Sequence, residues 1–454
     1  MNALKTIENY FQLRSQKTTF AKEIRAGLAT FLTMAYILFV NPAILSKAIN
    51  LPTQANTFGQ IMSATALAAA VGTMIMGLYA RYPFATAPGM GLNAFFTYTL
   101  VINQKIPWQT ALGCVFLSGL MAVVISIFGL RENIIRAFPI TLKRATAAGI
   151  GLFLAFIGFV NSGLVIDHPA TLVTLGSFKN PSVLLTCLGL LITGILLSHR
   201  VTGAILIGIA VVTITAIVTR LPVYQGHPFG GFAIGLVQTP VWPKDLMFAL
   251  DLKGALSVGL FTTILSMFFV DFFDTAGTLI GLADRAGFTD RQGNLPRGSK
   301  AFIADGLAST FGAVIGTSST TSYIESMAGI EEGGRTGLVS VVVSLLFLAS
   351  LFLWPLASAV PAAATAPALI LIGSMMLVSA INIPWDDARE SIPAFLTIVT
   401  MPLTYSITHG IAFGIIAYTL LNAASGQFKK LHPIMYVLTA LLMLKYGLEH
   451  HDGL

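Results

Sequence analysis

The fold of this chain is decided by two interrupted apolar stretches, FATAPGMGLNAFFTY at residues 84–98 and GTSSTTSYIESMAGI at residues 316–330. The first has Pro88, Gly89 and Gly91 in the middle of an apolar run. The second is too polar and too β-prone at its start for a helix that faces lipid. Irregular backbone at membrane depth is tolerated only where it is buried in protein or lines a cavity. Both stretches therefore predict broken membrane segments beside a binding site.

The composition is that of a polytopic membrane protein. Charged residues make up 10% of the 454 residues and apolar types 55%, whereas roughly a quarter of an average soluble domain is charged. Cys114 and Cys187 lie singly within apolar stretches, which gives neither a disulfide framework nor a metal site. The first 25 residues contain no signal-peptide core. The first membrane segment is therefore expected to act as its own insertion signal.

Fourteen apolar runs are candidates for crossing about 30 Å of hydrocarbon. They cover residues 27–45, 61–79, 84–101, 111–128, 145–165, 183–197, 204–218, 256–280, 302–315, 316–330, 338–354, 362–378, 393–407 and 411–421. A further stretch at residues 434–444 is expected to form a terminal helix that lies on the membrane or dips into it.

The basic residues orient this map. A cytoplasmic N-terminus places 19 Lys and Arg side chains inside and 6 outside, with Lys445 in the terminal stretch, as the positive-inside rule requires. The net charge of +7 is thereby explained by topology, and no nucleic-acid partner is predicted. The expected location is the inner (plasma) membrane.

The two interrupted stretches occupy matching places in two sets of segments. Each is third in its set of seven, and because seven is odd, the second set must run in the opposite sense through the membrane. Interrupted segments at matching positions of inverted repeats indicate a binding site near the middle of the membrane.

Four acidic residues fall within the predicted segments: Asp271, Asp274, Asp305 and Glu325. A carboxylate in hydrocarbon costs about 2.5–3.5 kcal/mol on the lenient insertion scales, so it must face a cavity, bind a ligand or hold a proton. Asp271 and Asp274 are three residues apart and share a helix face, so the pair can titrate as one unit. Asp305 lies near a helix start, where a structural role is favoured.

Glu325 follows a hydroxyl-rich run that starts at Thr317 and offers backbone N–H groups and hydroxyls to a polar ligand. Asn93 is the matching amide after the Gly-rich break. The alternative for all these residues is that they hydrogen-bond neighbouring helices only. The run from Gly89 to Ala94 fits a dinucleotide pattern, but it opens no βαβ unit, and we discard that motif.

Five motifs resemble the adenine/guanine/hypoxanthine permeases, the AzgA-like branch of the nucleobase transporters (nucleobase:cation symporter 2, the xanthine–uracil permease superfamily). They are GLATFLTMAYILFVNPAIL, APGMGLNAFFTY, FFVDFFDTAGTL, ADGLASTFGAVIGTSSTTSYIES followed by GIEEGGRTGL, and PAFLTIVTMPLTYSI. The resemblance implies an all-α membrane protein of fourteen spans as a 7+7 inverted repeat, similar to uracil permease, with short β-strands in segments three and ten. It also implies purine uptake by proton symport, an elevator-type mechanism and homodimers.

The same resemblance implies a division into domains. Residues 1–26 form a cytoplasmic N-terminal segment, and residues 426–454 form the terminal apolar segment. The core domain comprises residues 27–130 and 254–355, and the gate domain comprises residues 131–253 and 356–425.

The site residues follow from the motif matches and from the chemistry of a flat, uncharged purine that carries donors and acceptors. Tyr323 and Phe84 could add a stacking face. Asp386 or Asp387 falls where the family also carries acids, but neither is assigned. No cofactor and no metal is expected, with the proton as coupling ion. Substrate binding is predicted for Glu325, Asn93, Asp274, Ser319, Thr275, Tyr323 and Phe84, and proton coupling for Asp271, Asp274 and Glu325.

Several functions compete with purine transport. An enzyme is disfavoured because no nucleophile elbow, zinc motif or Walker motif occurs. A transporter of small anions on the same fold is disfavoured because intramembrane carboxylates would repel the substrate. Transport of uracil, xanthine or another small solute stays open, and the preferred purine is not fixed by the sequence.

Overall fold

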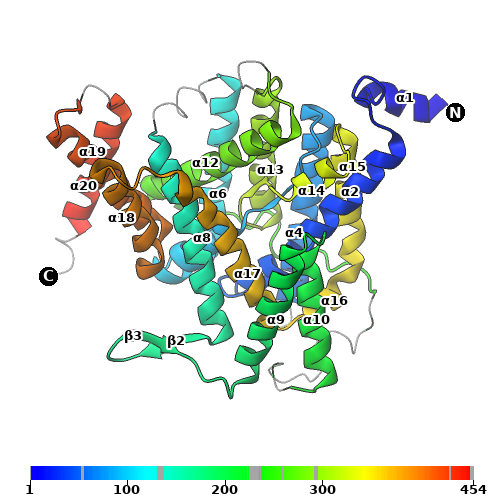
Figure 1. The fold of residues 1–454 in the computed structure, drawn as a ribbon, viewed down its shortest axis with the longest axis horizontal. Helices are drawn as coiled ribbons and strands as arrows, with labels where there is room; N and C mark the ends of the chain where they lie inside the picture. Colours follow the sequence, from blue (N-terminus) through cyan, green and yellow to red (C-terminus); the bar gives the residue numbers. More distant parts are fainter. Residues whose placement is uncertain are drawn as a thin grey trace. The chain divides into compact units, whose positions relative to one another are not determined.

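The computed structural model describes residues 2–52, 56–129, 138–221, 223, 235, 237–257, 260–290, 295–428 and 431–449 (Figure 1). Contacts divide the chain into two compact units. One comprises Met1–Ile127 with Gly158–Ala368, and the other comprises Phe128–Ile157 with Leu369–Leu454. Arg131, Arg136, Arg291, Lys429 and Lys430, which the predicted topology places inside, lie outside the described residues.

The protein is mostly helical, as predicted. Within the described residues, nine helices are long and apolar enough to cross a membrane. They are Phe20–Leu45, Thr57–Ala80, Trp108–Ile127, Ile140–Ser162, Pro181–Ser198, Thr263–Ala286, Gly337–Ser358, Ala362–Asn382 and Ile407–Ala424. Ala204–Val218 and Pro433–Leu444 are shorter apolar helices.

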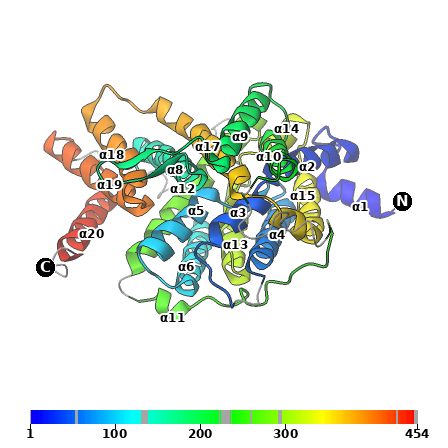
Figure 2. The same cartoon turned by 90° about the horizontal axis from the view of Figure 1, so that it is seen from below.

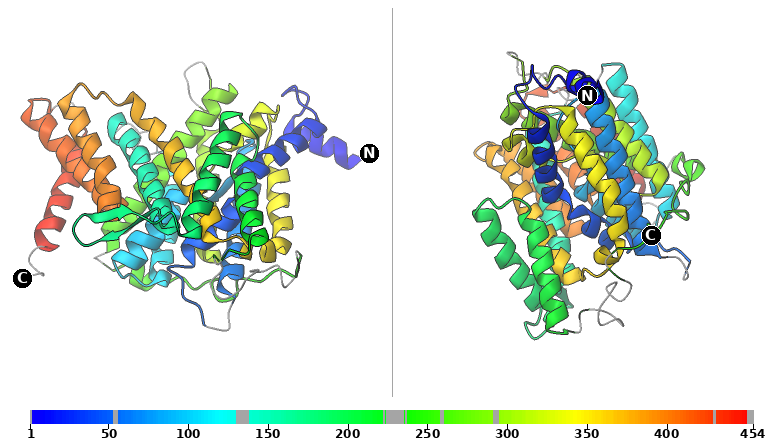
Figure 3. Two further views of the ribbon diagram at one scale, coloured as in Figure 1. Left: turned by 60° about the horizontal axis from the view of Figure 1, so that its bottom comes forward. Right: turned by 90° about the vertical axis from the view of Figure 1, so that its right-hand side faces the viewer.

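Six long helices build the frame of the first unit: α2 (Phe20–Met34), α4 (Thr57–Ile75), α6 (Trp108–Ile127), α12 (Phe261–Ala286), α13 (Gly298–Ile315) and α15 (Gly337–Ser350). Helix α13 packs against α4 and α6, and α15 packs against α2 and α4 (Figure 3, right). Small residues allow this close approach. A Cβ added at Gly72 of α4 would lie 2.6 Å from the Cβ of Ala308 on α13.

A two-stranded antiparallel sheet lies between these helices. Strand β1 (Thr86–Pro88) pairs with β4 (Thr320–Ser322), with Thr86 opposite Ser322. Each strand belongs to one of the interrupted stretches and is followed by a short helix, α5 (Met90–Ala94) or α14 (Ser326–Glu331). Pro88 has no N–H and ends the ladder, after which Gly89 N donates to Ser319 O at 2.9 Å. Helix α5 continues as the π-helix η2 (Phe95–Asn103).

The first apolar segment differs from the prediction at its start. We expected it to begin at residue 27, but α2 begins at Phe20 and is followed by α3 (Ile37–Leu45) after a short junction. Helix α3 lies beside α4 and α5 (Figure 2). Hydropathy misses the first turns of α2 because they contain Lys22, Glu23 and Arg25. The carboxylate of Glu23 is the buried one of the three. It accepts hydrogen bonds from the backbone and hydroxyl of Thr336 at 3.2 and 2.6 Å.

The rest of the first unit is peripheral to the sheet. The helix α1 (Asn2–Phe11) and the turn that follows it pack onto α15 through Phe11, Leu13 and Leu338. Helix α9 (Pro181–Ser198) lies beside α10 (Ala204–Val218) (Figure 3, left). A hairpin of β2 (Val165–His168) and β3 (Leu172–Leu175) was not predicted. The short elements are η1 (Met76–Ala80), α11 (Leu252–Ala255), η5 (Leu351–Leu353) and α16 (Trp354–Ser358).

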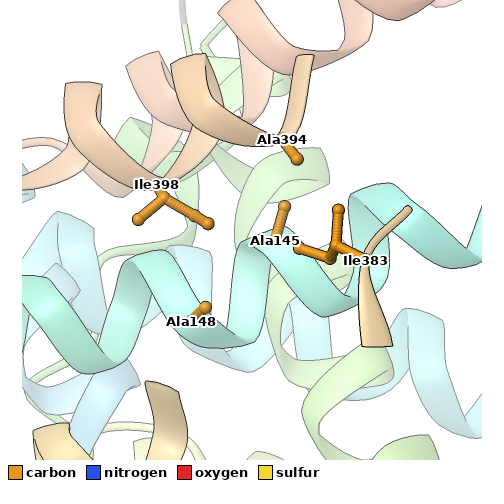
Figure 4. Close-up of a cluster of buried hydrophobic side chains, with 5 residues drawn as sticks. All are labelled: Ala145, Ala148, Ile383, Ala394 and Ile398. Carbon is orange, nitrogen blue, oxygen red and sulfur yellow. The ribbon is translucent and has the colours of Figure 1, made fainter. Parts of the chain in front are cut away.

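The second unit has its own apolar core. Its helices are α18 (Ala388–Thr404), α19 (Ile407–Ala424) and α20 (Pro433–Glu449), with η6 (Leu377–Asn382) and parts of α8 (Ile140–Ser162) and α17 (Ala362–Met376). Figure 4 shows Ala145 and Ala148 of α8 facing Ile383, Ala394 and Ile398. The predicted terminal stretch at residues 434–444 forms most of α20.

Candidate functional site

The four predicted acids lie around the β1–β4 sheet and fall into two kinds. Asp271 on α12 and Asp305 on α13 are 2% and 3% exposed. Asp274, one turn after Asp271, and Glu325, which directly precedes α14, are partly exposed. Only the second pair is therefore open to a ligand without rearrangement.

Asp305 holds the sheet to the helices. Its Oδ2 accepts a hydrogen bond from Thr275 Oγ1 at 2.6 Å, and its Oδ1 accepts from Ser322 N and Ser322 Oγ, both at 2.7 Å. Thr275 Oγ1 also lies 2.9 Å from Thr321 Oγ1. The carboxylate thus connects α12, α13 and β4. Thr275 supplies the hydroxyl on α12 that makes this connection.

Asp271 lies in a second hydrogen-bond network. Ser309 Oγ lies 3.2 Å from Asp271 Oδ2, 2.8 Å from Thr320 O and 2.8 Å from Ser319 Oγ. A hydroxyl has one proton, so Ser309 cannot donate to Asp271 and to Thr320 O at the same time. Asp271 Oδ1 is buried and has no protein partner among the described residues. A proton on Asp271, donated to Ser309 Oγ, would satisfy this arrangement.

Asp274 and Glu325 are electrostatic neighbours. Within the part of the chain that the structure describes, the carboxylate of Asp274 has no hydrogen-bond partner. Glu325 Oε1 accepts from Tyr36 OH at 2.6 Å, and Glu325 O lies 3.3 Å from Thr33 Oγ1. The two carboxylates can therefore accept N–H groups from a bound molecule.

Asn93 is fully buried on α5, and its Oδ1 accepts a hydrogen bond from Ser318 Oγ. Its Nδ2 has no partner among the described protein atoms, so one donor remains. Tyr323 OH donates to Pro88 O at 2.6 Å and thereby joins the two interrupted stretches. The structure brings Asn93, Ser319, Thr275 and Tyr323 to the same sheet.

Phe84, which was predicted to add a stacking face, lies two residues before β1. Its ring is buried and stacks on Tyr82, with centroids 4.9 Å apart and planes 7° apart, and it also contacts Phe288 at 6.1 Å. One face of the Phe84 ring is therefore covered by Tyr82.

Two polar residues of segment one escaped the sequence analysis. Tyr36 binds Glu325, and Asn41 Nδ2 donates to Thr65 Oγ1 at 2.7 Å and to Thr317 Oγ1 at 3.0 Å. Both lie in the quoted motif GLATFLTMAYILFVNPAIL. Asn41 could have been predicted, because an amide in an apolar run is unusual. Tyr36 could not, because Tyr is common in such runs.

Asp387 has a different setting in the second unit. It precedes α18, accepts from Arg389 N at 3.0 Å and pairs with the Arg389 guanidinium at 2.7 Å. These side-chain and backbone hydrogen bonds lower the pKa of Asp387 to about 2. Asp387 is therefore paired locally as a helix cap. Among the described residues, no group of three His, Cys, Asp or Glu side chains could hold a metal ion.

Comparisons with known proteins agree with this architecture. The guanine/hypoxanthine permease PbuG of Bacillus subtilis is 43% identical over 97% of this chain and 99% of its own. The adenine permease AdeP of Escherichia coli is 41% identical over 97% of this chain and 95% of its own. The murine anion transporter Slc26a9, in its inward-facing state, shares the fold with a TM-score of 0.62 at 12% identity, covering 92% of this chain and 72% of that chain.

The expected resemblance to the purine permeases is thus confirmed, and the chain is a transporter rather than an enzyme. A sequence model described as "Permease family", that of the xanthine/uracil permeases, matches residues 21–413. The chain therefore belongs to the xanthine/uracil permease family of multi-pass membrane proteins.

Proposed function

We propose that this protein takes up a purine nucleobase (adenine, guanine or hypoxanthine) by proton symport. The observation that carries the proposal is the pair of partly exposed carboxylates, Asp274 and Glu325, beside a sheet built from the two interrupted stretches. The names of relatives above 40% identity, a guanine/hypoxanthine permease and an adenine permease, support the substrate class.

The chemistry of the site suits a neutral heterocycle. Glu325 and Asp274 accept from ring N–H groups or from an exocyclic amine, and the free Nδ2 of Asn93 donates to a ring nitrogen or carbonyl. Hydrogen bonds to charged groups are stronger than neutral ones, so a small base can be bound by few contacts. Ser319, Thr275 and Tyr323 shape the sheet beside it.

Asp271 is the proposed main proton carrier, and Asp274 tunes the affinity for substrate. When Ser309 Oγ donates its one proton to Thr320 O, it can accept a hydrogen bond from a protonated Asp271. An intramembrane carboxylate without a basic partner is typical of a proton relay. Glu325 is the next candidate for the coupling proton.

The proposed architecture has fourteen spans in a 7+7 inverted repeat. The protein lies in the inner membrane with its N-terminus on the cytoplasmic side. The core domain, residues 27–130 and 254–355, moves as an elevator against the gate domain, residues 131–253 and 356–425, and the protein forms homodimers. The split of the β1–β4 sheet between the two halves of the chain supports the repeat.

The second candidate is transport of another small solute, either uracil or xanthine or a small anion. The fold shared with an anion transporter favours it, but fold alone does not define substrate. The carboxylates of Asp274 and Glu325 would repel an anion. Uracil and xanthine are neutral bases that could use the same hydrogen bonds.

A competition uptake assay tests the proposal. Cells that lack their own permeases express the protein and take up radiolabelled adenine or hypoxanthine in competition with guanine, uracil, xanthine and bicarbonate. We expect saturable purine uptake that a protonophore abolishes. Uptake displaced by bicarbonate but not by purines, or strict dependence on Na⁺, would contradict it.

A further inference from the structure

The junction between α2 and α3 contacts the site directly. Helix α2 ends at Met34 and α3 starts at Ile37, and the Tyr36 side chain between them is 1% exposed. Its hydroxyl lies 2.6 Å from Glu325 Oε1 across 289 residues of sequence. One turn earlier, Thr33 Oγ1 lies 3.3 Å from the backbone O of Glu325 and 2.8 Å from Thr30 O of its own helix. Segment one therefore holds both the backbone and the side chain of Glu325.

This hydrogen bond controls which part of Glu325 can meet a ligand. A carboxylate has two oxygens that accept hydrogen bonds, and Tyr36 occupies Oε1. Further acceptor sites of the carboxylate are left for substrate, and the hydrogen bond from Tyr36 restricts its rotation. A phenol buried in this way requires a polar partner, so the contact is strongly favoured in the folded state.

The bond is not needed to hold α14 on α2, because close packing already does so. A Cβ added at Gly329 of α14 would lie 2.5 Å from Ala26 O and 2.2 Å from Thr30 Oγ1. Removing one hydroxyl from Tyr36 therefore leaves the helix contact in place. The Tyr36 hydroxyl therefore acts on the Glu325 side chain and not on the packing of the helices.

We propose that Tyr36 is a positioning residue that sets purine affinity by orienting Glu325. The proposal rests on the function proposed above. It makes segment one a third wall of the site, beside the two interrupted stretches. Because Tyr36 acts through Glu325, its contribution must vanish once Glu325 cannot accept the hydroxyl.

The test is a double-mutant cycle on the purified full-length protein, measured by equilibrium binding of radiolabelled adenine or hypoxanthine and by uptake kinetics. Tyr36→Phe keeps the ring and removes the hydroxyl. We expect Kd and KM to rise roughly 10- to 100-fold, the range for loss of a hydrogen bond to a charged group, with little change in the maximal rate. In the Glu325→Asp background, whose shorter carboxylate cannot reach Tyr36, the same substitution should have no further effect.

Two controls make the result decisive. Tyr10→Phe removes a hydroxyl that donates to Leu78 O at 2.8 Å and should bind as the wild type does. Thr33→Val removes the contact to the Glu325 backbone together with the contacts of the same hydroxyl to Ala29 O and Thr30 O within α2. It leaves the bond between Tyr36 and Glu325 in place and should cause a smaller loss. A wild-type Kd for Tyr36→Phe overturns the proposal, as does an independent, multiplicative loss in the double variant. Failure of the wild-type protein to bind any purine would instead overturn the proposed function.

Discussion

The two interrupted stretches have similar backbones and different chemistry. Each contributes a three-residue buried strand followed by a short helix. The first is built mainly from Pro, Gly and apolar residues, with two buried threonines, Thr86 and Thr97, and one buried amide, Asn93. The second has six consecutive Ser and Thr residues, 317–322, and Glu325 follows them. The comparison teaches that the two stretches share a backbone frame, whereas the second stretch supplies most of the polar chemistry.

Replacing the acid of the second stretch should have the largest effect. Glu325→Ala should abolish purine binding, because the acceptor that Tyr36 orients is removed and only one of the two site carboxylates, Asp274, remains. Glu325→Gln keeps the size and should retain weak binding, with a loss of roughly 1.5–3 kcal/mol. Equilibrium binding to purified protein measures both, with gel filtration as the control for folding. Wild-type affinity in Glu325→Ala would remove this residue from the site.

Substitution of the α12 acids separates coupling from binding. Asp271→Asn mimics the protonated acid, so it should bind and exchange purine but fail to concentrate it against a gradient. Asp274→Asn should mainly weaken binding. Binding and net uptake with and without an imposed pH gradient are measured for both variants. If only Asp274→Asn fails to accumulate purine, the two roles are reversed, and if both accumulate it normally, the proton is carried elsewhere.

The amide of the first stretch should matter less than Glu325. Asn93→Ala removes one donor to the ligand and leaves Ser318 Oγ without its acceptor. We expect affinity to fall about 10-fold, the equivalent of one neutral hydrogen bond of about 1.4 kcal/mol. Isothermal titration of both Ala variants compares the two stretches directly. An Asn93→Ala loss as large as that of Glu325→Ala would contradict the asymmetry.

The frame itself can be tested at Gly89, where the two stretches approach each other. A Cβ at this position would lie 2.7 Å from Thr321 Cγ2, so Gly89→Ala should destabilise the protein by about 1–3 kcal/mol through overpacking. Thr321→Ser removes that methyl group and keeps the hydroxyl near Thr275, so it should partly rescue the variant. Thermal unfolding in detergent measures the rescue. Equal destabilisation in both backgrounds would rule out this contact.

Much of the frame could be predicted, because apolar length and the breaks at Pro88 and Gly89 are local properties of the sequence. The acids could be selected because a carboxylate in hydrocarbon is costly. The start of α2 at Phe20 could not be predicted, since Glu23 is made tolerable by Thr336, a partner far along the chain. The β2–β3 hairpin has no sharp alternating pattern and was missed.

The site was predicted as a set of residues but not as a set of connections. Nothing in the sequence indicates that Asp305 and Asp271 are bound by different hydroxyls, Thr275 and Ser309. Nor does it indicate that Tyr36 faces Glu325 rather than lipid. Such pairings depend on the rotation of each helix, which hydropathy does not determine.

The pairing of β1 with β4 also dictates when the site can form during synthesis. Tyr323 OH reaches Pro88 O across 235 residues of sequence, a length that a ribosome takes roughly 10–50 s to translate at about 5–20 residues per second. During that interval the newly inserted first half contains a strand without its partner and a buried amide without Ser318. Chaperones of membrane insertion that shield polar backbone groups would act on this partly synthesised chain. Mutations that slow synthesis of the second half would lower the yield of folded protein before they change its transport activity.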